Sequence, residues 1–161
     1  MTVEFARTSS PIGPLLVAAD EAGVRLIEFA GRPGATAPPR EWRRAQQPRG
    51  PLCATLVQLA EYFAGRRRTF DLPLAPEGTP FQLAIWRAVA RIPYGKTITY
   101  AELARRAGRP AAPRAAGAAN GQNPLPIVVP CHRVVGSDGA LRGFGGGLPA
   151  KAALLALERG R

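Results

Sequence analysis

The chain has 161 residues, enough for one hydrophobic core or two small domains, and its 46% of apolar residues is typical of a globular protein, not a disordered one. No apolar run approaches the roughly 20 residues that cross a bilayer, and the N-terminus has no secretory signal, so we expect a cytoplasmic protein, nucleoid-associated if bacterial. The net charge of +11, almost all arginine, favours nucleic acid as a partner, although a GC-rich coding sequence would also raise the arginine content.

Two cysteines, Cys53 and Cys131, are too few for a framework of disulfides. The chain has a single histidine, which argues against a closed zinc site of the Cys/His type, so no metal is expected. Each cysteine is therefore interpreted as a free thiol.

The N-terminal half is predicted to form a small sheet with one helix. Short apolar segments separated by turn residues predict strands around Val3–Arg7, Leu15–Ala19 and Val24–Phe29. The Pro- and Gly-rich segment Gly31–Gly50 is expected to be a loop or poorly ordered, and apolar residues at helical spacing predict a helix over Leu52–Ala64.

The chain is expected to divide into two domains. The proline-rich segment Phe70–Gly78 predicts an extended strand that leads into a linker. We therefore predict an N-terminal α/β domain over residues 1–76 and a mostly helical domain over residues 77–161. The basic run Arg66–Arg68 is interpreted as solvated surface, with a contact to DNA as the alternative.

Capping signals mark three helices in the C-terminal half. Thr79, followed by a proline and then Gln82, predicts a capping box at the start of a helix that ends near Ile92. A second box at Thr99–Glu102 predicts a short helix ending near Ala107, and a third helix is expected over about Pro113–Asn120. The last two helices and their short turn predict a helix-turn-helix.

The third helix consists mainly of alanine and glycine, and Arg114 is its only charged residue. A reader of the DNA major groove would present more side chains that hydrogen-bond to base edges. The small residues instead favour close approach to a nucleic-acid backbone or to the minor groove.

The only histidine directly follows one of the two cysteines, as Cys131-His132. The β-branched run Ile127–Val129 predicts that the pair lies at the end of a strand, where a thiol can act as a nucleophile with a nearby base. A buried cysteine beside an unrelated histidine would give the same dipeptide. The residues alone leave a hydrolase and a transferase both open.

The second half of the chain resembles the O6-alkylguanine-DNA alkyltransferases, also called methylated-DNA–protein-cysteine methyltransferases. The resemblance extends from Thr79 to Glu158, about half of the chain. The motifs that carry it are Thr79–Gln82, Thr97–Ala104, Arg114–Asn120, Asn123–Val129, Pro130–Arg133 and Gly143–Gly147.

The resemblance implies an α/β fold, in which a ribonuclease-H-like β-sheet domain with a helix precedes a helix-turn-helix, winged-helix-like domain that carries the active-site cysteine. It implies direct reversal of DNA damage: a flipped O6-alkylguanine, with O4-alkylthymine left open as a second substrate, loses its alkyl group irreversibly to Cys131. Flipping is needed because a thiol cannot reach guanine O6 in line inside a duplex. Each molecule reacts once and needs no cofactor.

The resemblance also implies the catalytic roles of five residues. Cys131 is the acceptor, His132 is the base that draws the thiol proton through a bridging water, and Glu158 orients the imidazole. Asn123 holds the turn that carries the cysteine. Tyr100 donates a proton or a hydrogen bond to the leaving guanine.

Substrate and DNA contacts follow from the same resemblance. Arg114 is the finger that enters the stack where the nucleotide has rotated out. The backbone carbonyl of Val134 and the N–H of Gly145 contact the base edge, and Phe144, a tyrosine in many relatives, covers one face of the pocket. The other residues expected to contact DNA are Ala115, Gly117, Ala118 and Asn120.

The expected partner is double-stranded alkylated DNA, bound through its minor groove by a monomer, with cooperative assembly along DNA left open. No membrane partner is expected. Two alternative functions are a non-catalytic lesion-binding protein of the alkyltransferase-like kind and an unrelated cysteine hydrolase. Cys131 argues against the first, because those relatives lack the acceptor cysteine. The Arg114 helix and the charge argue against the second.

Overall fold

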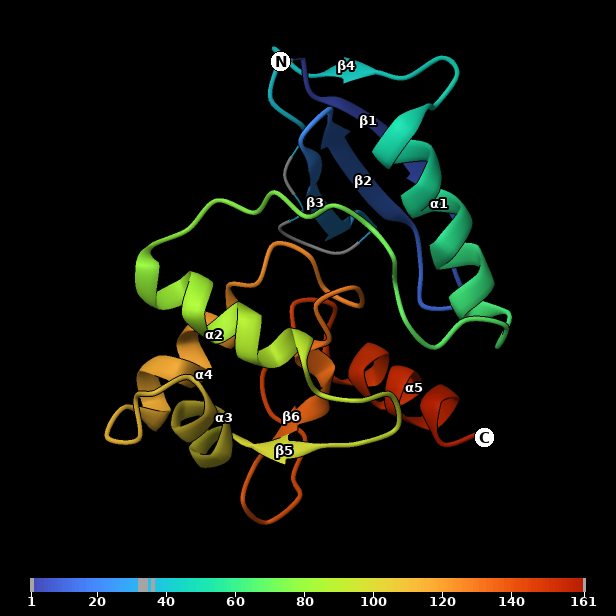
Figure 1. Cartoon of the computed structure of the whole chain (residues 1–161). Coiled ribbons are helices and arrows are strands. Elements are labelled where there is room, and N and C mark those ends of the chain that lie inside the picture. The colour runs from blue at the N-terminus through green and yellow to red at the C-terminus, as the bar shows by residue number, and fades with distance from the viewer. Residues whose placement is uncertain (1, 32–34, 36, 161) are drawn as a thin grey trace. The chain divides into compact units, whose positions relative to one another are not determined.

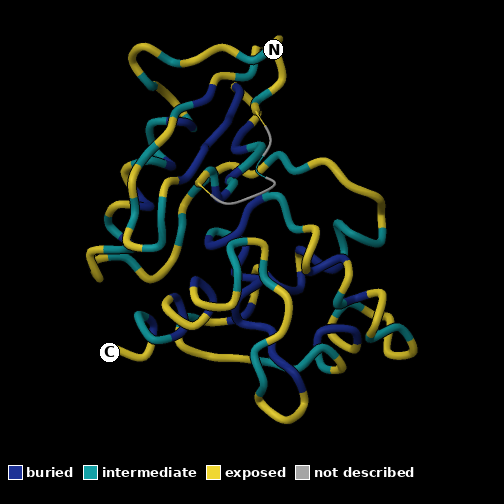
Figure 2. The backbone as a smooth tube through the Cα atoms, turned by 180° about the vertical axis from the view of Figure 1, so that it is seen from behind, coloured by how far each residue is buried: buried dark blue, intermediate teal, exposed yellow. Residues whose placement is uncertain are grey.

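The computed structural model describes residues 2–31, 35 and 37–160. The chain divides into two compact units, Met1–Pro76 and Glu77–Arg161, and each is described by itself. Buried positions concentrate in β2 and β3, on the inner faces of the helices and in the segment from Leu125 to Val135, whereas most other turns are exposed (Figure 2). No helix in the described part of the chain is long and apolar enough to cross a membrane.

The N-terminal unit is a four-stranded sheet with one helix (Figure 1). Its strands are β1 (Glu4–Thr8), β2 (Leu15–Asp20), β3 (Gly23–Phe29) and β4 (Arg43–Arg44), in the order β3-β2-β1-β4. The first three strands are antiparallel neighbours, and β4 pairs in parallel with β1. Helix α1 (Gly50–Phe63) packs on the sheet.

Every residue of β2 is buried, because both faces of this central strand are covered. Side chains alternate between the faces of a strand. Leu16 and Ala18 belong to a cluster that Trp42, from the long loop, partly covers. Leu15 and Val17 point to the opposite face, which α1 covers.

The three predicted strands and the first helix are confirmed, with α1 beginning at Gly50, two residues early. The predicted loop over Gly31–Gly50 contains the two-residue strand β4; residues 32–34 and 36 lie outside the described residues. The predicted strand over Phe70–Gly78 is wrong. Only an isolated bridge between Val24 and Leu74 forms there, since the prolines of this segment cannot donate to a ladder.

The C-terminal unit is mostly helical (Figure 1). The predicted architecture, a sheet domain followed by a helical helix-turn-helix domain, is therefore confirmed. In chain order its elements are α2 (Pro80–Ala90), β5 (Ile98–Thr99), α3 (Tyr100–Arg106), α4 (Pro113–Gly121), the 3-10 turn η1 (Cys131–Arg133), β6 (Val134–Val135) and α5 (Leu148–Glu158).

The two predicted caps differ in outcome. At α2, the Thr79 hydroxyl accepts from the Gln82 N–H at 3.1 Å and the Gln82 side chain accepts from the Thr79 N–H at 2.9 Å, so the box is complete. At α3, Thr99 accepts from the Glu102 N–H, but the Glu102 carboxylate pairs with two arginines one turn later. The second box is therefore only half formed.

Helices α2, α3 and α4 pack against one another around a shared core. Ile85, Leu103 and Ala116 are fully buried there, and the Trp86 indole N–H donates to the Ala119 carbonyl at 2.8 Å. Strands β5 and β6 pair in parallel and bring the start of α3 beside the end of η1. Helix α5 has no counterpart among the predicted elements.

Candidate active site

Cys131 lies in a tight turn, not at the end of a strand. The three residues from Cys131 to Arg133 form η1, and the run Ile127–Val129 before it is a turn in which Ile127 has a φ of 75°. The strand predicted for this run is wrong. Prolines at 124, 126 and 130 remove ladder donors, and a β-branched residue at positive φ is a backbone outlier that its surroundings must hold in place.

Two asparagines hold this turn. The Asn123 amide donates to the Val129 carbonyl at 2.7 Å and its side-chain oxygen accepts from the Leu125 N–H at 2.9 Å. The Asn120 amide donates to the Cys131 carbonyl at 3.3 Å. Asn120 was expected among the DNA-contacting residues of its helix, but it is only 2% exposed and its side chain faces the cysteine turn.

The Cys131 thiol is buried, with 6% exposure. Burial raises its pKa from an ordinary 9.0 to about 11; a hydrogen bond from Asn123 and the charge of Lys151 act in the opposite direction without reversing the shift. The resting protein therefore holds a protonated thiol at neutral pH.

We predict that Cys131 reacts slowly with iodoacetamide at pH 7.5. Because the thiolate is the nucleophile, a pKa raised from 9.0 to about 11 lowers the reactive fraction about 100-fold. The measurement is peptide mass mapping over time, with the urea-unfolded chain as reference and the half-buried Cys53 as internal comparison. Modification of Cys131 at the same rate in folded and unfolded protein would contradict the prediction.

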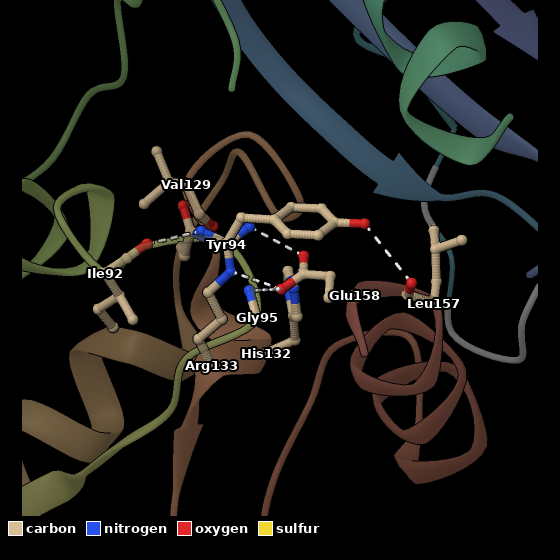
Figure 3. A network of polar contacts seen from close by, with 9 residues as sticks. Ile92, Tyr94, Gly95, Val129, His132, Arg133, Leu157 and Glu158 are labelled. Carbon is tan, nitrogen blue, oxygen red and sulfur yellow. Dashed lines mark hydrogen bonds and ion pairs between the residues drawn. The ribbon is translucent and has the colours of Figure 1, made fainter. Parts of the chain in front are cut away.

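His132 and Glu158 form a buried pair (Figure 3). His132 Nε2 lies 2.8 Å from Glu158 Oε2, and both side chains are 0% exposed. An ionised carboxylate only accepts hydrogen bonds, so Nε2 carries the proton and Nδ1 is left as an acceptor. Nδ1 is buried and has no hydrogen-bond partner among the described residues. Burial lowers the pKa of His132 although Glu158 opposes the shift, so the imidazole is neutral.

Two buried cations, Arg133 and Lys151, join this site although neither was expected there. Arg133 contacts both oxygens of Glu158, at 2.8 and 2.9 Å. Lys151, 0% exposed, donates to the carbonyls of Val134 at 2.7 Å and Arg142 at 2.6 Å. Helical spacing could have indicated Lys151, because it shares a face of α5 with Leu155 and Glu158, four and seven residues later.

Tyr100 reaches the same network from the first residue of α3. Its hydroxyl donates to the Arg142 carbonyl at 3.4 Å. Burial raises the pKa of Tyr100; nearby Arg142 opposes this and the Cys131 sulfur adds to it, so the phenol stays protonated. The ring packs against Gly117 of α4, where an added Cβ would lie 3.2 Å from a ring carbon. Gly117 therefore lets the tyrosine approach this helix.

The residues expected to contact the base lie around the imidazole and in the loop before α5. The Phe144 ring meets His132 edge to face, with centroids 6.5 Å apart. The Val134 carbonyl already accepts from Lys151, and Gly145 is exposed in the loop.

The remaining residues expected to contact DNA are on the surface of α4. Arg114, Ala115 and Ala118 are exposed, and Gly117 is half-buried. This helix belongs to the more basic part of the chain, since residues 77–161 hold 12 of the 22 Lys and Arg but only 4 of the 11 Asp and Glu. The expected residues thus fall into a buried or half-buried group around Cys131, the exposed Gly145 in the loop before α5, and a group on the surface of α4.

Comparison with known families accounts for nearly the whole chain. Residues 4–76 match the ribonuclease-like domain of 6-O-methylguanine DNA methyltransferase, and residues 80–160 match the DNA binding domain of the same family. The methylated-DNA–protein-cysteine methyltransferase of Methanosarcina acetivorans is 45% identical over 154 residues, which cover 96% of this chain and 97% of that protein.

Solved structures agree with the sequence comparison. The crystal structure of Mycobacterium tuberculosis O6-methylguanine methyltransferase is similar to this chain with a TM-score of 0.89 and 42% identity, over 99% of this chain and 94% of that one. A crystal structure of Mycobacterium tuberculosis OGT in complex with DNA matches over the same shares, with a TM-score of 0.86 and 40% identity.

Proposed function

This chain belongs to the 6-O-methylguanine DNA methyltransferase family, and we propose that it repairs DNA by moving the alkyl group of O6-alkylguanine irreversibly onto the sulfur of Cys131. The observation that supports this most is the buried Cys131 thiol next in sequence to a neutral His132 whose Nδ1 is free to accept a proton. Each molecule reacts once, and no cofactor takes part.

The proposed reaction is a nucleophilic displacement at the alkyl carbon. His132 Nδ1 takes the thiol proton through a bridging water, and Glu158 keeps the imidazole oriented. The S–C bond forms as the C–O6 bond breaks, and the electron pair leaves with the guanine. Tyr100, a phenol that stays protonated, donates a hydrogen bond or a proton to the guanine ring, because a neutral guanine leaves more readily than its anion.

The pKa values indicate when the thiolate forms. A thiol with a pKa of about 11 does not transfer its proton to an imidazole whose pKa is lowered below the usual value of 6.5. Thiolate formation is therefore unfavourable at rest, and we infer that it accompanies the attack on the alkyl carbon. Asn123 and Lys151, which both lower the thiol pKa, stabilise the charge that develops on sulfur.

The proposed DNA-binding element is α4, which enters the minor groove with its small exposed residues facing the DNA. Arg114 replaces the flipped nucleotide in the stack, and the Val134 carbonyl, the Gly145 N–H and the Phe144 ring line the base pocket. We propose a monomer that binds double-stranded DNA and is associated with the nucleoid if its source is a bacterium, with cooperative assembly on DNA as an outcome to be measured.

We predict that Arg114→Ala slows repair of duplex DNA by at least about 10-fold but changes the reaction with the free base O6-benzylguanine less than about 2-fold. A free base needs no extrusion from a stack, so only the duplex substrate uses the arginine. Single-turnover transfer rates on the two substrates provide the measurement, and Arg109→Ala, also exposed and basic, is the matched control. Equal losses on both substrates would argue against a flipping role.

The test of the proposed function is the intact mass of the protein after incubation with an O6-methylguanine duplex. A gain of one methyl group that peptide mapping places on Cys131 supports the proposal. A non-catalytic lesion-binding protein would bind the duplex without a gain in mass. A cysteine hydrolase would leave the duplex unrepaired and show no preference for it.

A further inference from the structure

Arg133 is a buried charge that has no part in the bond-making steps. It is 5% exposed, and one guanidinium nitrogen donates to the Ile92 carbonyl at 2.6 Å. Its other two nitrogens donate to the two oxygens of Glu158 (Figure 3). Its guanidinium carbon lies 5.7 Å from the centre of the Tyr94 ring. Arg133 is thus held from three sides in one orientation.

Glu158 accepts hydrogen bonds on both oxygens, and His132, Arg133 and Gly95 are among the donors. Oε2 accepts from His132 at 2.8 Å and from Arg133 at 2.9 Å; Oε1 accepts from Arg133 at 2.8 Å and from the Gly95 N–H at 3.2 Å. A two-point arginine–carboxylate contact fixes the carboxylate plane as well as its position. His132 therefore meets an acceptor that cannot rotate away.

The same contact changes the charge that His132 faces. A bare carboxylate 2.8 Å from a buried imidazole would favour the imidazolium form, in which Nδ1 carries a proton. Burial is the main cause that lowers the pKa of His132, and the positive charges of Arg133, beside that carboxylate, and of Lys151 of α5, near the ring, lower it further. The other titratable neighbour, Cys131, is a neutral thiol at neutral pH.

Building on the proposed function, we infer that Arg133 is a positioning residue for alkyl transfer: it fixes both oxygens of Glu158 and offsets their charge, so that His132 stays neutral with Nδ1 free to accept the thiol proton. Removing the guanidinium charge raises the pKa of His132, so that the imidazolium form, with a proton on Nδ1, is more populated. That form does not take a proton from Cys131.

Histidine protonation can be observed directly, because His132 is the only histidine in the chain. Protein labelled with ¹⁵N-histidine gives ring signals from this residue alone, and their shifts report its protonation from pH 5 to 9 without any substrate. We expect the protonation midpoint of Arg133→Met to lie at least about one pH unit above that of the unsubstituted protein. Identical midpoints would overturn the inference.

Two further variants separate charge from folding. Arg133→Met/Glu158→Gln removes both charges, so its midpoint should return toward that of the unsubstituted protein. Arg133→Lys keeps the charge without the two-point contact, so its midpoint should stay within about half a pH unit of that value. If Arg133→Met does not fold, the lysine variant still tests the inference. A protonation midpoint of His132 in Arg133→Lys that is as high as in free histidine peptides would mean that a positive charge at position 133 does not keep the imidazole neutral, and would overturn the inference.

Kinetics give the second readout. Single-turnover transfer from O6-benzylguanine by Arg133→Met should lose more of its rate at pH 6.5 than at pH 8.5, because a larger share of the imidazole is neutral at the higher pH. A purely structural role would lower the rate equally at every pH. If even the unsubstituted protein transfers no alkyl group, the proposed function fails, whereas the NMR titration still tests Arg133.

Discussion

Replacement of Cys131 by serine is expected to abolish alkyl transfer while DNA binding persists. Serine has nearly the same size, so the turn held by Asn123 and Asn120 should be kept. A hydroxyl is a much weaker nucleophile than a thiol toward an alkyl carbon, and the transfer rate should fall by roughly 1,000-fold or more. The exposed face of α4, with Arg114, is untouched by the change.

The measurement is the intact mass of the variant after incubation with an O6-methylguanine duplex, alongside fluorescence anisotropy for DNA affinity at several salt concentrations. Cys53→Ser is the matched control and should transfer the methyl group at the normal rate. Affinity should fall steeply with salt for both variants, as backbone contacts require. A methyl group found on the serine variant would refute Cys131 as the acceptor.

Glu158→Ala is expected to have the largest effect on stability. The substitution leaves the Arg133 guanidinium buried without its carboxylate and removes the partner of His132 Nε2. Breaking a buried pair in this way lowers the free energy of unfolding by about 3–5 kcal/mol. The transfer rate should also fall, by roughly 100-fold or more, because the imidazole loses its orientation.

Urea unfolding monitored by circular dichroism measures the free energy, and single-turnover transfer measures the rate. Glu61→Ala is the matched control: Glu61 also pairs with an arginine, Arg67, but its side chain is 35% exposed. An exposed pair contributes about 1 kcal/mol or less, so this variant should differ little from the unsubstituted protein. The buried-pair interpretation fails if both variants lose the same free energy of unfolding.

Local signals were sufficient for much of the fold. The strands of the N-terminal sheet follow from apolar segments between turn residues, and the complete cap at Thr79 marks the start of α2. The helix-turn-helix follows in the same way, since Thr99 caps α3 and Gly108, with a φ of 75°, follows its end. These signals act within a few residues, which is why a single sequence reveals them.

Features in which particular contacts override a local preference were not predicted. The run Ile127–Val129 has the composition of a strand, but the side chain of Asn123 and the neighbouring prolines bend it into a turn. The two-residue strand β4 exists only because β1 offers an edge. In both segments, contacts with other residues override the structure that the local sequence favours.

The buried cations were missed for a related reason. Arginine and lysine are almost never fully buried unless they are paired, so Arg133 and Lys151 were not expected in the site. The partners of Arg133 are Glu158 of α5 and the carbonyl of Ile92, and those of Lys151 are the carbonyls of Val134 and Arg142; these partners lie between 9 and 41 residues away in the sequence. Asn120 was likewise assigned to DNA contact from its helix, although its position on the inner face of α4 buries it.

The raised pKa of the Cys131 thiol has a consequence for the lifetime of the protein between repair events. Peroxides oxidise thiolates, and at pH 7.5 a pKa of about 11 leaves roughly one molecule in 3,000 with a thiolate at this position. A protein that reacts only once would be lost as surely by oxidation as by repair. Burial thus protects the Cys131 sulfur from oxidation before repair. The thiolate forms only when a damaged base is bound.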